Sequence, residues 1–326
     1  MTVNTIYHYT TARYELSLLH RIKKNMSINA IEINALSKKY GDNNAISNIT
    51  LNVNEGEVFG YLGPNGAGKT TTIRILVDLI RSTSGSASIF GLDTRDDGEE
   101  VRSKIGYLPS DIALYENLTG KDLLKHLSNI RKIVEWDYVS NLADRLECDL
   151  SLRISTLSRG NKQKIGLIQS LMHRPKLVIM DEPSSGLDPL MQQEFYQLVK
   201  EIKSEGRTIF ISSHIIPEIE RLCDRVGIIR DGILLTVEEI DALKQKSVHQ
   251  IEFHFTQPAT EDALNKIPGV SKLTVDGNSV KCTVIGSPDK LIKAASKFEI
   301  TKLISHEPNL EETFLSYYGK ANPDAQ

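Results

Sequence analysis

A glycine-rich run with a single lysine constrains this chain more than any other feature of its sequence. Residues 63–70 read Gly-Pro-Asn-Gly-Ala-Gly-Lys-Thr, which matches the pattern G-x-x-x-x-G-K-[ST] in full. An apolar stretch, 58–62, precedes the run, and residues 70–80 follow it with apolar side chains at helical spacing. The order strand, glycine-rich loop, helix predicts an α/β fold whose loop binds phosphate oxygens.

Each part of this run has a chemical role. Glycines let backbone N–H groups turn inward around phosphate oxygens, and the following helix presents its positive end to the same phosphates. Lys69 is expected to reach the β- and γ-phosphates, Thr70 to ligate Mg²⁺, and Thr71 to contact the α-phosphate. The residues expected to bind the nucleotide here are Gly63, Pro64, Asn65, Gly66, Ala67, Gly68, Lys69, Thr70 and Thr71.

A second apolar run ends in two carboxylates. Residues 177–182 read Leu-Val-Ile-Met-Asp-Glu, which is typical of a buried parallel strand. Such a strand delivers its C-terminal residues to a nucleotide held at the same edge of the sheet. We therefore expect Asp181 to hold Mg²⁺ and Glu182 to orient and deprotonate the attacking water.

Composition narrows the possible partners. The 326 residues carry a formal net charge of −3, without the basic excess that nucleic-acid binding usually requires. No stretch of 18 or more apolar residues is present, so the chain is not expected to cross a bilayer by itself. Three scattered cysteines, Cys148, Cys223 and Cys282, form no metal-binding spacing, which favours a reducing, cytoplasmic setting.

The pattern along the chain predicts two domains. We expect residues 1–27 to be a disordered extension and residues 28–240 to be the nucleotide-binding domain. Two helical stretches within it indicate a helical subdomain at about 111–160. The order strand-helix-strand-strand-helix-strand over 241–326 predicts an accessory α+β domain, a split βαβ of the ferredoxin-like kind.

Four further segments resemble motifs of the ABC (ATP-binding cassette) ATPases. Residues 157–163, Leu-Ser-Arg-Gly-Asn-Lys-Gln, resemble the family's signature motif. Residues 185–188 resemble its D-loop, 211–214 its switch-histidine segment, and 38–41 the segment with its adenine-stacking aromatic residue. With the phosphate loop and the Asp-Glu strand, these motifs occur in family order from about residue 28 to residue 232.

The resemblance implies a head-to-tail dimer in which each nucleotide lies between one copy's phosphate loop and the other copy's signature motif. Ser158 and the Gly160 N–H would then meet the γ-phosphate across the dimer, and His214 would touch it in cis. It also implies that Tyr40 stacks on adenine and that Asp188, in the D-loop, lies at the nucleotide. Structural alternatives remain: Ser158 as a helix N-cap, His214 as a structural histidine and Tyr40 as a surface aromatic.

One position departs from the family pattern. After residues 105–109, Ile-Gly-Tyr-Leu-Pro, the family usually places a glutamine that contacts Mg²⁺ and water, whereas this chain has Ser110. The shorter serine puts direct metal contact in doubt, although the loop can still transmit motion to a permease. The C-terminal run 307–315 is similar to the tail of export ATPases that serve multidrug, antibiotic-resistance or polysaccharide permeases.

The resemblance therefore implies the ATP-binding and ATP-hydrolysing subunit of an ABC exporter. Such a subunit forms a homodimer around two ATP with Mg²⁺ and is peripheral to the inner face of the cell membrane, held there by a separately encoded polytopic permease. The alternative is a soluble ABC ATPase that acts on ribosomes or nucleic acid, but the chain has one phosphate loop and no long heptad run. A regulator that binds nucleotide without hydrolysis is a third possibility, against which Glu182 counts.

Overall fold

The computed structural model describes residues 29–132, 135–246, 248–257, 264, 267–285 and 288–306. The extension expected over residues 1–27 and the tail at 307–315 lie outside these residues. None of the described helices has both the length and the apolar character needed to cross a membrane.

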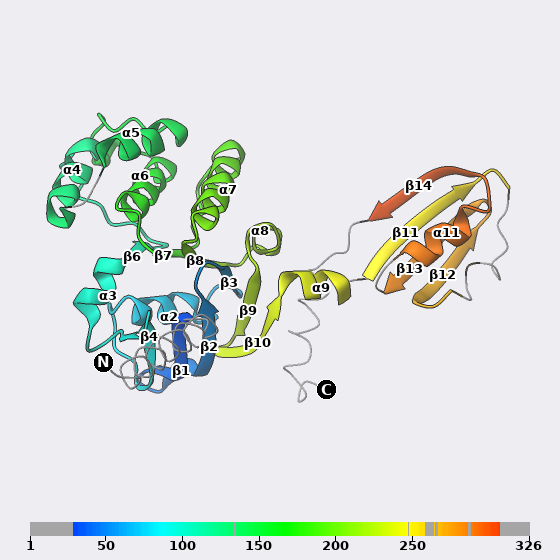
Figure 1. Cartoon of the computed structure of the whole chain (residues 1–326), viewed down its shortest axis with the longest axis horizontal. Coiled ribbons are helices and arrows are strands. Elements are labelled where there is room, and N and C mark those ends of the chain that lie inside the picture. The colour runs from blue at the N-terminus through cyan, green and yellow to red at the C-terminus, as the bar shows by residue number, and fades with distance from the viewer. Residues whose placement is uncertain are drawn as a thin grey trace, which may run out of the picture. The chain divides into compact units, whose positions relative to one another are not determined.

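The chain forms strands and helices in the alternating order expected of an α/β protein (Figure 1). The strands are β1 Asn29–Tyr40, β2 Asn43–Asn54, β3 Val58–Leu62, β4 Ser84–Ile89, β5 Leu92–Asp93, β6 Ile105–Leu108, β7 Leu177–Asp181, β8 Thr208–Ser213, β9 Arg225–Arg230, β10 Ile233–Glu239, β11 Val248–Phe255, β12 Val270–Asp276, β13 Ser279–Ile285 and β14 Ile300–His306. The helices are α2 Lys69–Leu76, α3 Gly98–Lys104, α4 Gly120–Arg131, α5 Trp136–Arg145, α6 Arg159–Leu171, α7 Pro189–Ser204, α8 Ile216–Leu222, α9 Ile240–Lys246 and α11 Asp289–Ala295, with a 3₁₀ turn at Ile154–Thr156.

A six-stranded sheet provides the frame of the nucleotide-binding part. Its strand order is β10-β9-β3-β8-β7-β6, and β6, β7 and β8 run parallel to one another. Every residue of β3 and β7 is buried, because helices cover both faces of such a sheet. This burial explains why both strands appear in the sequence as continuous apolar runs.

Packing divides the chain into two units. Of the residues that the structure describes, the first unit contains those within 29–59, 66–212 and 231–233, and the second contains those within 60–65, 213–230 and 234–306. The first unit includes an antiparallel sheet of order β2-β1-β4-β5, together with α2 and the helices α4 to α7. The second includes α8, β9, α9 and the C-terminal sheet.

The helix after the phosphate loop is shorter than the sequence pattern predicts. The apolar spacing indicates a helix to residue 80, whereas α2 ends at Leu76. Val77 is its C-cap, and Asp78 then adopts a φ of +58°, a left-handed conformation that cannot continue an α-helix. The two helices expected in the helical subdomain are confirmed as α4 and α5.

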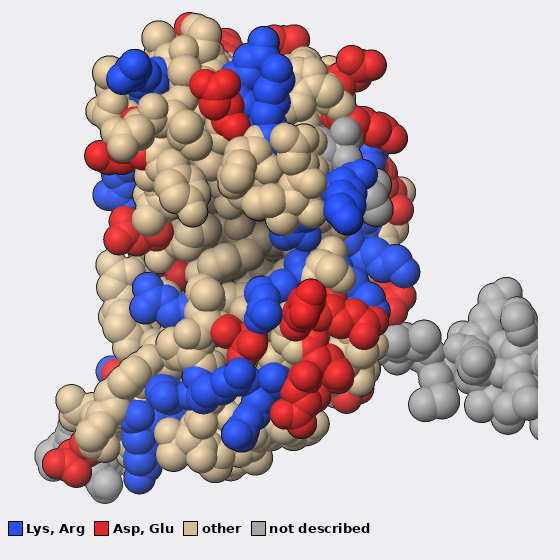
Figure 2. Space-filling model, turned by 90° about the vertical axis from the view of Figure 1, so that its left-hand side faces the viewer, with Lys and Arg blue, Asp and Glu red and all other residues tan. Residues whose placement is uncertain are grey.

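The side of the first unit that carries α3 and α4 is hollowed (Figure 2). Figure 2 shows lysine and arginine side chains gathered there beside a hollow whose floor is largely uncharged. A cavity of about 230 Å³ lies in this unit, lined by Val77, Leu79, Arg102, Ile105, Tyr107, Leu127, Arg131, Gln169, Met172 and His173.

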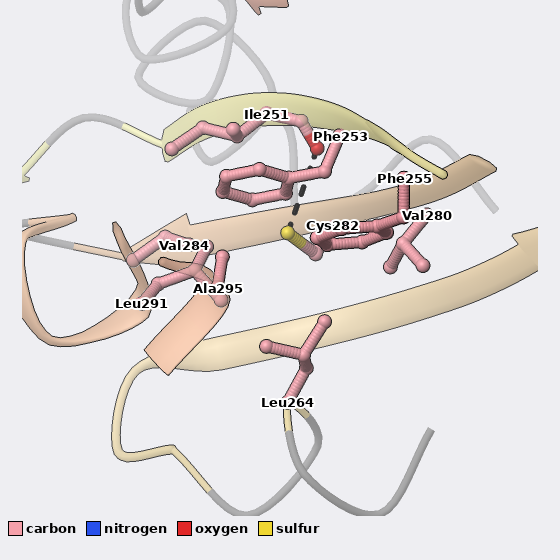
Figure 3. Close-up of a cluster of buried hydrophobic side chains, with 9 residues drawn as sticks. All are labelled: Ile251, Phe253, Phe255, Leu264, Val280, Cys282, Val284, Leu291 and Ala295. Carbon is pink, nitrogen blue, oxygen red and sulfur yellow. Dashed lines mark hydrogen bonds between the residues drawn. The ribbon is translucent and has the colours of Figure 1, made fainter. Parts of the chain in front are cut away.

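The C-terminal sheet has the strand order β12-β13-β11-β14 and is antiparallel throughout. With α11 between β13 and β14, this order is that of a ferredoxin-like split βαβ, as expected. The helix expected between β11 and β12 falls largely outside the described residues. Figure 3 shows its buried cluster, where the Cys282 thiol donates to the carbonyl oxygen of Ile251 at 3.5 Å. The buried residues of the cluster are Ile251, Phe253, Phe255, Leu264, Val280, Cys282, Val284, Leu291 and Ala295.

Candidate functional site

The phosphate loop joins β3 to α2 through backbone conformations that favour glycine. Gly66 and Gly68 have φ angles of +82° and +103°, which side-chain-bearing residues rarely adopt. Gly68 is the N-cap of α2, and this helix has neither a capping side chain nor an acidic residue in its first turn. The first N–H groups of this helix carry partial positive charge, which suits a bound anion.

Lys69 and Glu182 form an ion pair at the start of α2. The Lys69 Nζ lies 3.1 Å from the Glu182 Oε1, and the two side chains are only 5% and 16% exposed. Opposite charges attract more strongly when shielded from water, so this contact holds both groups at the phosphate loop. The structure thus brings the expected phosphate-binding cation to the expected general base.

Asp181 is held on both sides by hydroxyl groups. The Thr70 hydroxyl donates to its Oδ2 at 2.7 Å, and the Ser212 hydroxyl donates to its Oδ1 at 2.5 Å. Asp181 is fully buried, so these donors compensate for the lost hydration of its carboxylate. The sequence alone did not point to Ser212. The feature that could have drawn attention to it is a polar residue near the end of a buried apolar strand, β8.

The donor set around Asp181 suits Mg²⁺. Thr70 and Asp181 offer oxygen ligands, which hard divalent cations prefer. The described residues contain no group of three or more His, Cys, Asp or Glu side chains that could hold a metal by themselves. A cation at this position would therefore complete its shell with phosphate oxygens and water, as Mg²⁺ usually does beside a nucleotide.

The electrostatic effect of Asp181 extends to the neighbouring strand. Burial, and after it the negative charge of Asp181, raise the pKa of the Tyr107 phenol on β6 to about 12. Arg74 opposes this rise through its charge and a hydrogen bond. The phenol of Tyr107 consequently stays protonated over the whole physiological pH range.

Glu182 has an unusual backbone conformation. Its φ is +54°, a region that non-glycine residues seldom occupy and that costs free energy unless neighbouring contacts hold it. The Glu182 N–H donates to both the carbonyl oxygen and the hydroxyl of Ser212, each at 3.2 Å. The backbone of Glu182 is therefore held by the neighbouring strand β8.

The signature segment lies at the start of α6. Ser158 is the N-cap of this helix, and its exposed hydroxyl oxygen accepts from the Asn161 N–H at 3.3 Å. The expected structural alternative for Ser158 is thus present, but the hydroxyl proton stays available to donate to a ligand. The first turn of α6 contains no acidic residue.

Gly160 is required by close packing rather than by its dihedral angles. A Cβ at this position would lie 2.6 Å from the Gly186 carbonyl oxygen, too close for any real contact. Beside it, the buried Gln163 side chain donates to the Pro183 carbonyl oxygen at 2.9 Å. The start of α6 therefore rests on the loop that follows Glu182 in the same protomer.

The remaining predicted residues lie at the ends of strands and helices. Asp188 is the N-cap of α7, and its Oδ1 accepts from two backbone N–H groups, of Leu190 and Met191, at 3.0 Å each. Tyr40 ends β1 with 51% of its surface exposed, and the Lys38 Nζ lies 5.0 Å from its ring centroid.

Ser110 and His214 follow strands of the six-stranded sheet. The half-buried Ser110 lies two residues beyond the end of β6, and His214 lies directly after β8. The structure thus joins Lys69 to Glu182 and Thr70 to Asp181 by direct contacts. The nucleotide contacts assigned to Tyr40, Ser110, Ser158, Gly160, Asp188 and His214 stay predictions.

Comparison with known proteins agrees with this geometry. A family model described as ABC transporter matches residues 46–185. The bacitracin transport ATP-binding protein BcrA of Bacillus licheniformis is 34% identical over 297 residues, covering 89% of this chain and 97% of that protein. The linearmycin resistance ATP-binding protein LnrL of Bacillus subtilis (strain 168) is 31% identical over 305 residues, covering 89% and 98%.

Solved structures agree with the fold. The ATP-binding subunit of an ABC transporter, 32% identical, superposes with a TM-score of 0.61 over 66% of this chain and 92% of that one. A dimeric bacterial ABC transporter cassette, 24% identical, gives 0.60 over 64% and 98%, a likeness of fold alone. Since the similarity to BcrA and LnrL extends along nearly their whole length, this chain belongs to the ATP-binding proteins of ABC transporters, the ABC ATPases.

Proposed function

We propose that two copies of this chain bind two ATP with Mg²⁺ and hydrolyse them to drive export through a separately encoded membrane permease. The observation that carries the proposal is the ion pair between Lys69 and Glu182 beside the hydrogen-bonded pair Thr70 and Asp181. These contacts support the proposal because they bring together, at one phosphate loop, the residues for which we propose the roles of phosphate-binding cation, metal ligands and general base.

Each of these residues has a defined task in phosphoryl transfer to water. Lys69 and the N–H groups of the loop bind the β- and γ-phosphate oxygens. Thr70 and Asp181 hold Mg²⁺, which when bound neutralises charge that develops on the phosphates. Glu182 orients the attacking water and accepts its proton, because its carboxylate lies next to the cation that binds the γ-phosphate.

A second copy of the chain supplies the remaining contacts in this proposal. The Ser158 hydroxyl and the Gly160 N–H lie at the exposed start of α6, a 13-residue helix with no acidic first turn, and suit an anion from outside the protomer. A solved neighbour with the same fold is dimeric. His214 would contact the γ-phosphate in cis, Tyr40 would stack on adenine, and Ser110 and Asp188 would lie at the nucleotide.

Transport is supported by the names of the relatives. BcrA is named for bacitracin transport, and LnrL is named for linearmycin resistance. We infer that this chain serves a hydrophobic or amphipathic compound and lies at the cytoplasmic face of the cell membrane, bound to its permease. Nucleic acid is not an expected partner.

The substitution Glu182→Gln tests the catalytic part of the proposal. It keeps the shape of the side chain but removes the base, so phosphate release should fall by about a hundredfold or more. ATP binding should stay near that of the wild type, and light scattering should show an ATP-dependent dimer. The matched control, Glu99→Gln, changes an exposed glutamate in α3 and should hydrolyse ATP normally.

Two outcomes would contradict the proposal. If Glu182→Gln hydrolysed ATP at the wild-type rate, Glu182 would not be the general base. If the protein stayed strictly monomeric at saturating ATP, the nucleotide site would not be shared between two copies. Affinity purification of the full chain from membranes should recover a polytopic permease. Recovery with ribosomes instead would favour the alternative function.

A further inference from the structure

Ser212 lies directly across the sheet from the metal-binding carboxylate. β7 and β8 are parallel neighbours, and their register pairs Asp181 with Ser212. The Ser212 side chain is fully buried, with 0% of its surface exposed. Its hydroxyl therefore cannot form hydrogen bonds with bulk water. It instead faces Asp181 and Glu182, the expected metal ligand and general base.

The Ser212 hydroxyl serves both carboxylate residues at once. It donates to the Asp181 Oδ1 at 2.5 Å, and it accepts from the Glu182 N–H at 3.2 Å. A serine hydroxyl has one donor and two acceptor lone pairs, so the two bonds can exist together. One side chain thus connects the side chain of the metal ligand to the backbone of the general base.

The first of these bonds orients the carboxylate of Asp181. Thr70 donates to Oδ2 and Ser212 donates to Oδ1, so the carboxylate plane is fixed from both sides. A hydrogen bond to a charged, buried acceptor is stronger than one between neutral groups. Without Ser212, the carboxylate could rotate about its Cβ–Cγ bond and present its oxygens less accurately to a cation.

The second bond supports the unusual backbone of Glu182. A φ of +54° at a non-glycine residue persists only where neighbouring contacts hold it. The carbonyl oxygen of Ser212 accepts from the same N–H at 3.2 Å, so both polar atoms of one residue contribute. In this conformation the Glu182 Oε1 lies 3.1 Å from the Lys69 Nζ.

We propose that Ser212 is a positioning residue for the ATPase reaction, which orients the Asp181 carboxylate toward Mg²⁺ and holds Glu182 in its turn. The inference rests on the proposed function and adds to it a residue outside the phosphate loop and the Asp-Glu strand. Ser212 contacts neither phosphate nor water in this role, and it acts through the two carboxylate residues.

A metal-binding measurement tests this role independently of turnover. The full chain is saturated with the non-hydrolysable ATP analogue AMP-PNP, and Mn²⁺, a probe for Mg²⁺, is titrated and followed by electron paramagnetic resonance. Ser212→Ala should weaken Mn²⁺ affinity about tenfold to a hundredfold, the range expected for a hydrogen bond to a charged group. Binding of AMP-PNP in the absence of metal should stay as in the wild type.

Two further variants separate positioning from packing. Ser212→Cys nearly preserves the side-chain volume but has a weak donor, so its Mn²⁺ affinity should lie between those of serine and alanine. If packing alone mattered, the cysteine variant would bind Mn²⁺ as tightly as the wild type. Ser170→Ala is the matched control, because Ser170 is buried and its hydroxyl donates to a carbonyl oxygen of its own helix, that of Leu167, at 2.8 Å.

The outcomes distinguish this inference from the proposed function. Wild-type Mn²⁺ affinity in both Ser212 variants would overturn the positioning role while leaving the ATPase assignment intact. Absence of Mn²⁺ binding to the wild-type chain with AMP-PNP would instead overturn the ATPase site itself. Should Ser212→Ala fail to fold, the Ser212→Cys titration decides the question alone.

Discussion

His173 is a half-buried histidine that directly follows the C-cap of α6. Its Nε2 lies 3.0 Å from the Ile105 carbonyl oxygen, so Nε2 carries the proton of the neutral ring. Its Nδ1 has no hydrogen-bond partner within the described part of the chain. Burial, followed by the charge of Arg131, lowers the pKa of His173 to about 4, because a second proton on this ring would be poorly solvated and repelled.

This depressed pKa predicts an acid-dependent loss of stability. An unfolded histidine binds its proton near pH 6.5, whereas folded His173 binds it only near pH 4. Between these values the unfolded state holds more protons, so the free energy of unfolding falls as the pH falls from about 6.5 toward 4. Above pH 7 the residue makes no pH-dependent contribution.

The substitution His173→Gln isolates this effect. Glutamine can still donate to the Ile105 carbonyl oxygen but does not titrate. Urea unfolding at pH 7.5 and at pH 5.0 should show a smaller loss of stability in the variant than in the wild type. Equal losses in the two proteins would mean that His173 is not a source of the acid sensitivity.

At the scale of elements, a forked ion pair fastens α5 to α7. The Arg145 Nε donates to Glu194 at 2.6 Å, and its two terminal nitrogens donate to Glu201 at 2.6 and 2.9 Å. Such a bidentate geometry fixes direction as well as distance. Hydrogen bonds to Glu201, more than those to Glu194, raise the pKa of Arg145, which therefore stays charged. Helix α5 of the expected helical subdomain is thus tied to α7, the helix that Asp188 caps.

A double-mutant cycle measures this connection. With Arg145→Met and Glu201→Gln, we expect a coupling free energy of about 0.5–1 kcal/mol in urea unfolding, because both side chains keep contact with water. The coupling should shrink at high salt. The helical pair Lys104 and Glu100, bonded at 2.8 Å within α3, is the control and should give about half a kcal/mol or less. If the coupling free energy of Arg145 and Glu201 were no larger than that of Lys104 and Glu100, the link between α5 and α7 would be no stronger than an ordinary surface ion pair.

At the scale of the whole molecule, the C-terminal sheet has a hydrophobic cluster of its own. The nine buried residues of this cluster all lie between positions 251 and 295. Phe253 is fully buried and stacks on Phe255 with ring centroids 5.8 Å apart, and Phe298 meets Phe255 edge to face at 5.7 Å. A segment with a separate core can unfold separately.

The substitution Phe253→Ala tests this separation. Loss of a fully buried ring should cost about 3–5 kcal/mol, and we expect the loss to appear in the C-terminal sheet. Calorimetry should then show that the C-terminal sheet unfolds at a lower temperature than in the wild type, while ATP affinity measured by titration stays unchanged. Val275→Ala, at a position that is 37% exposed on β12, is the control and should change stability by no more than about 0.5 kcal/mol. If ATP binding were lost when the C-terminal sheet unfolds, the whole chain would unfold as one unit.

The sequence by itself determined the features that depend only on residues close together in the chain. The phosphate loop could be predicted because its turn needs glycines at Gly66 and Gly68, and the Asp-Glu pair because a buried strand is continuously apolar. The α/β core and the ferredoxin-like sheet were predicted from the order of local patterns, and the family from the resemblance of short motifs; all three are confirmed. The boundary at residue 241, the dimer and the permease stay predictions.

Only the tertiary structure decided which distant side chains meet. Ser212 contacts Asp181 because the register of β7 and β8 pairs them, although they lie 31 positions apart. Gly160 must be glycine because the loop at Gly186 packs against it. Such contacts depend on strand register and on the packing of separate elements, and neither leaves a periodic pattern in the local sequence.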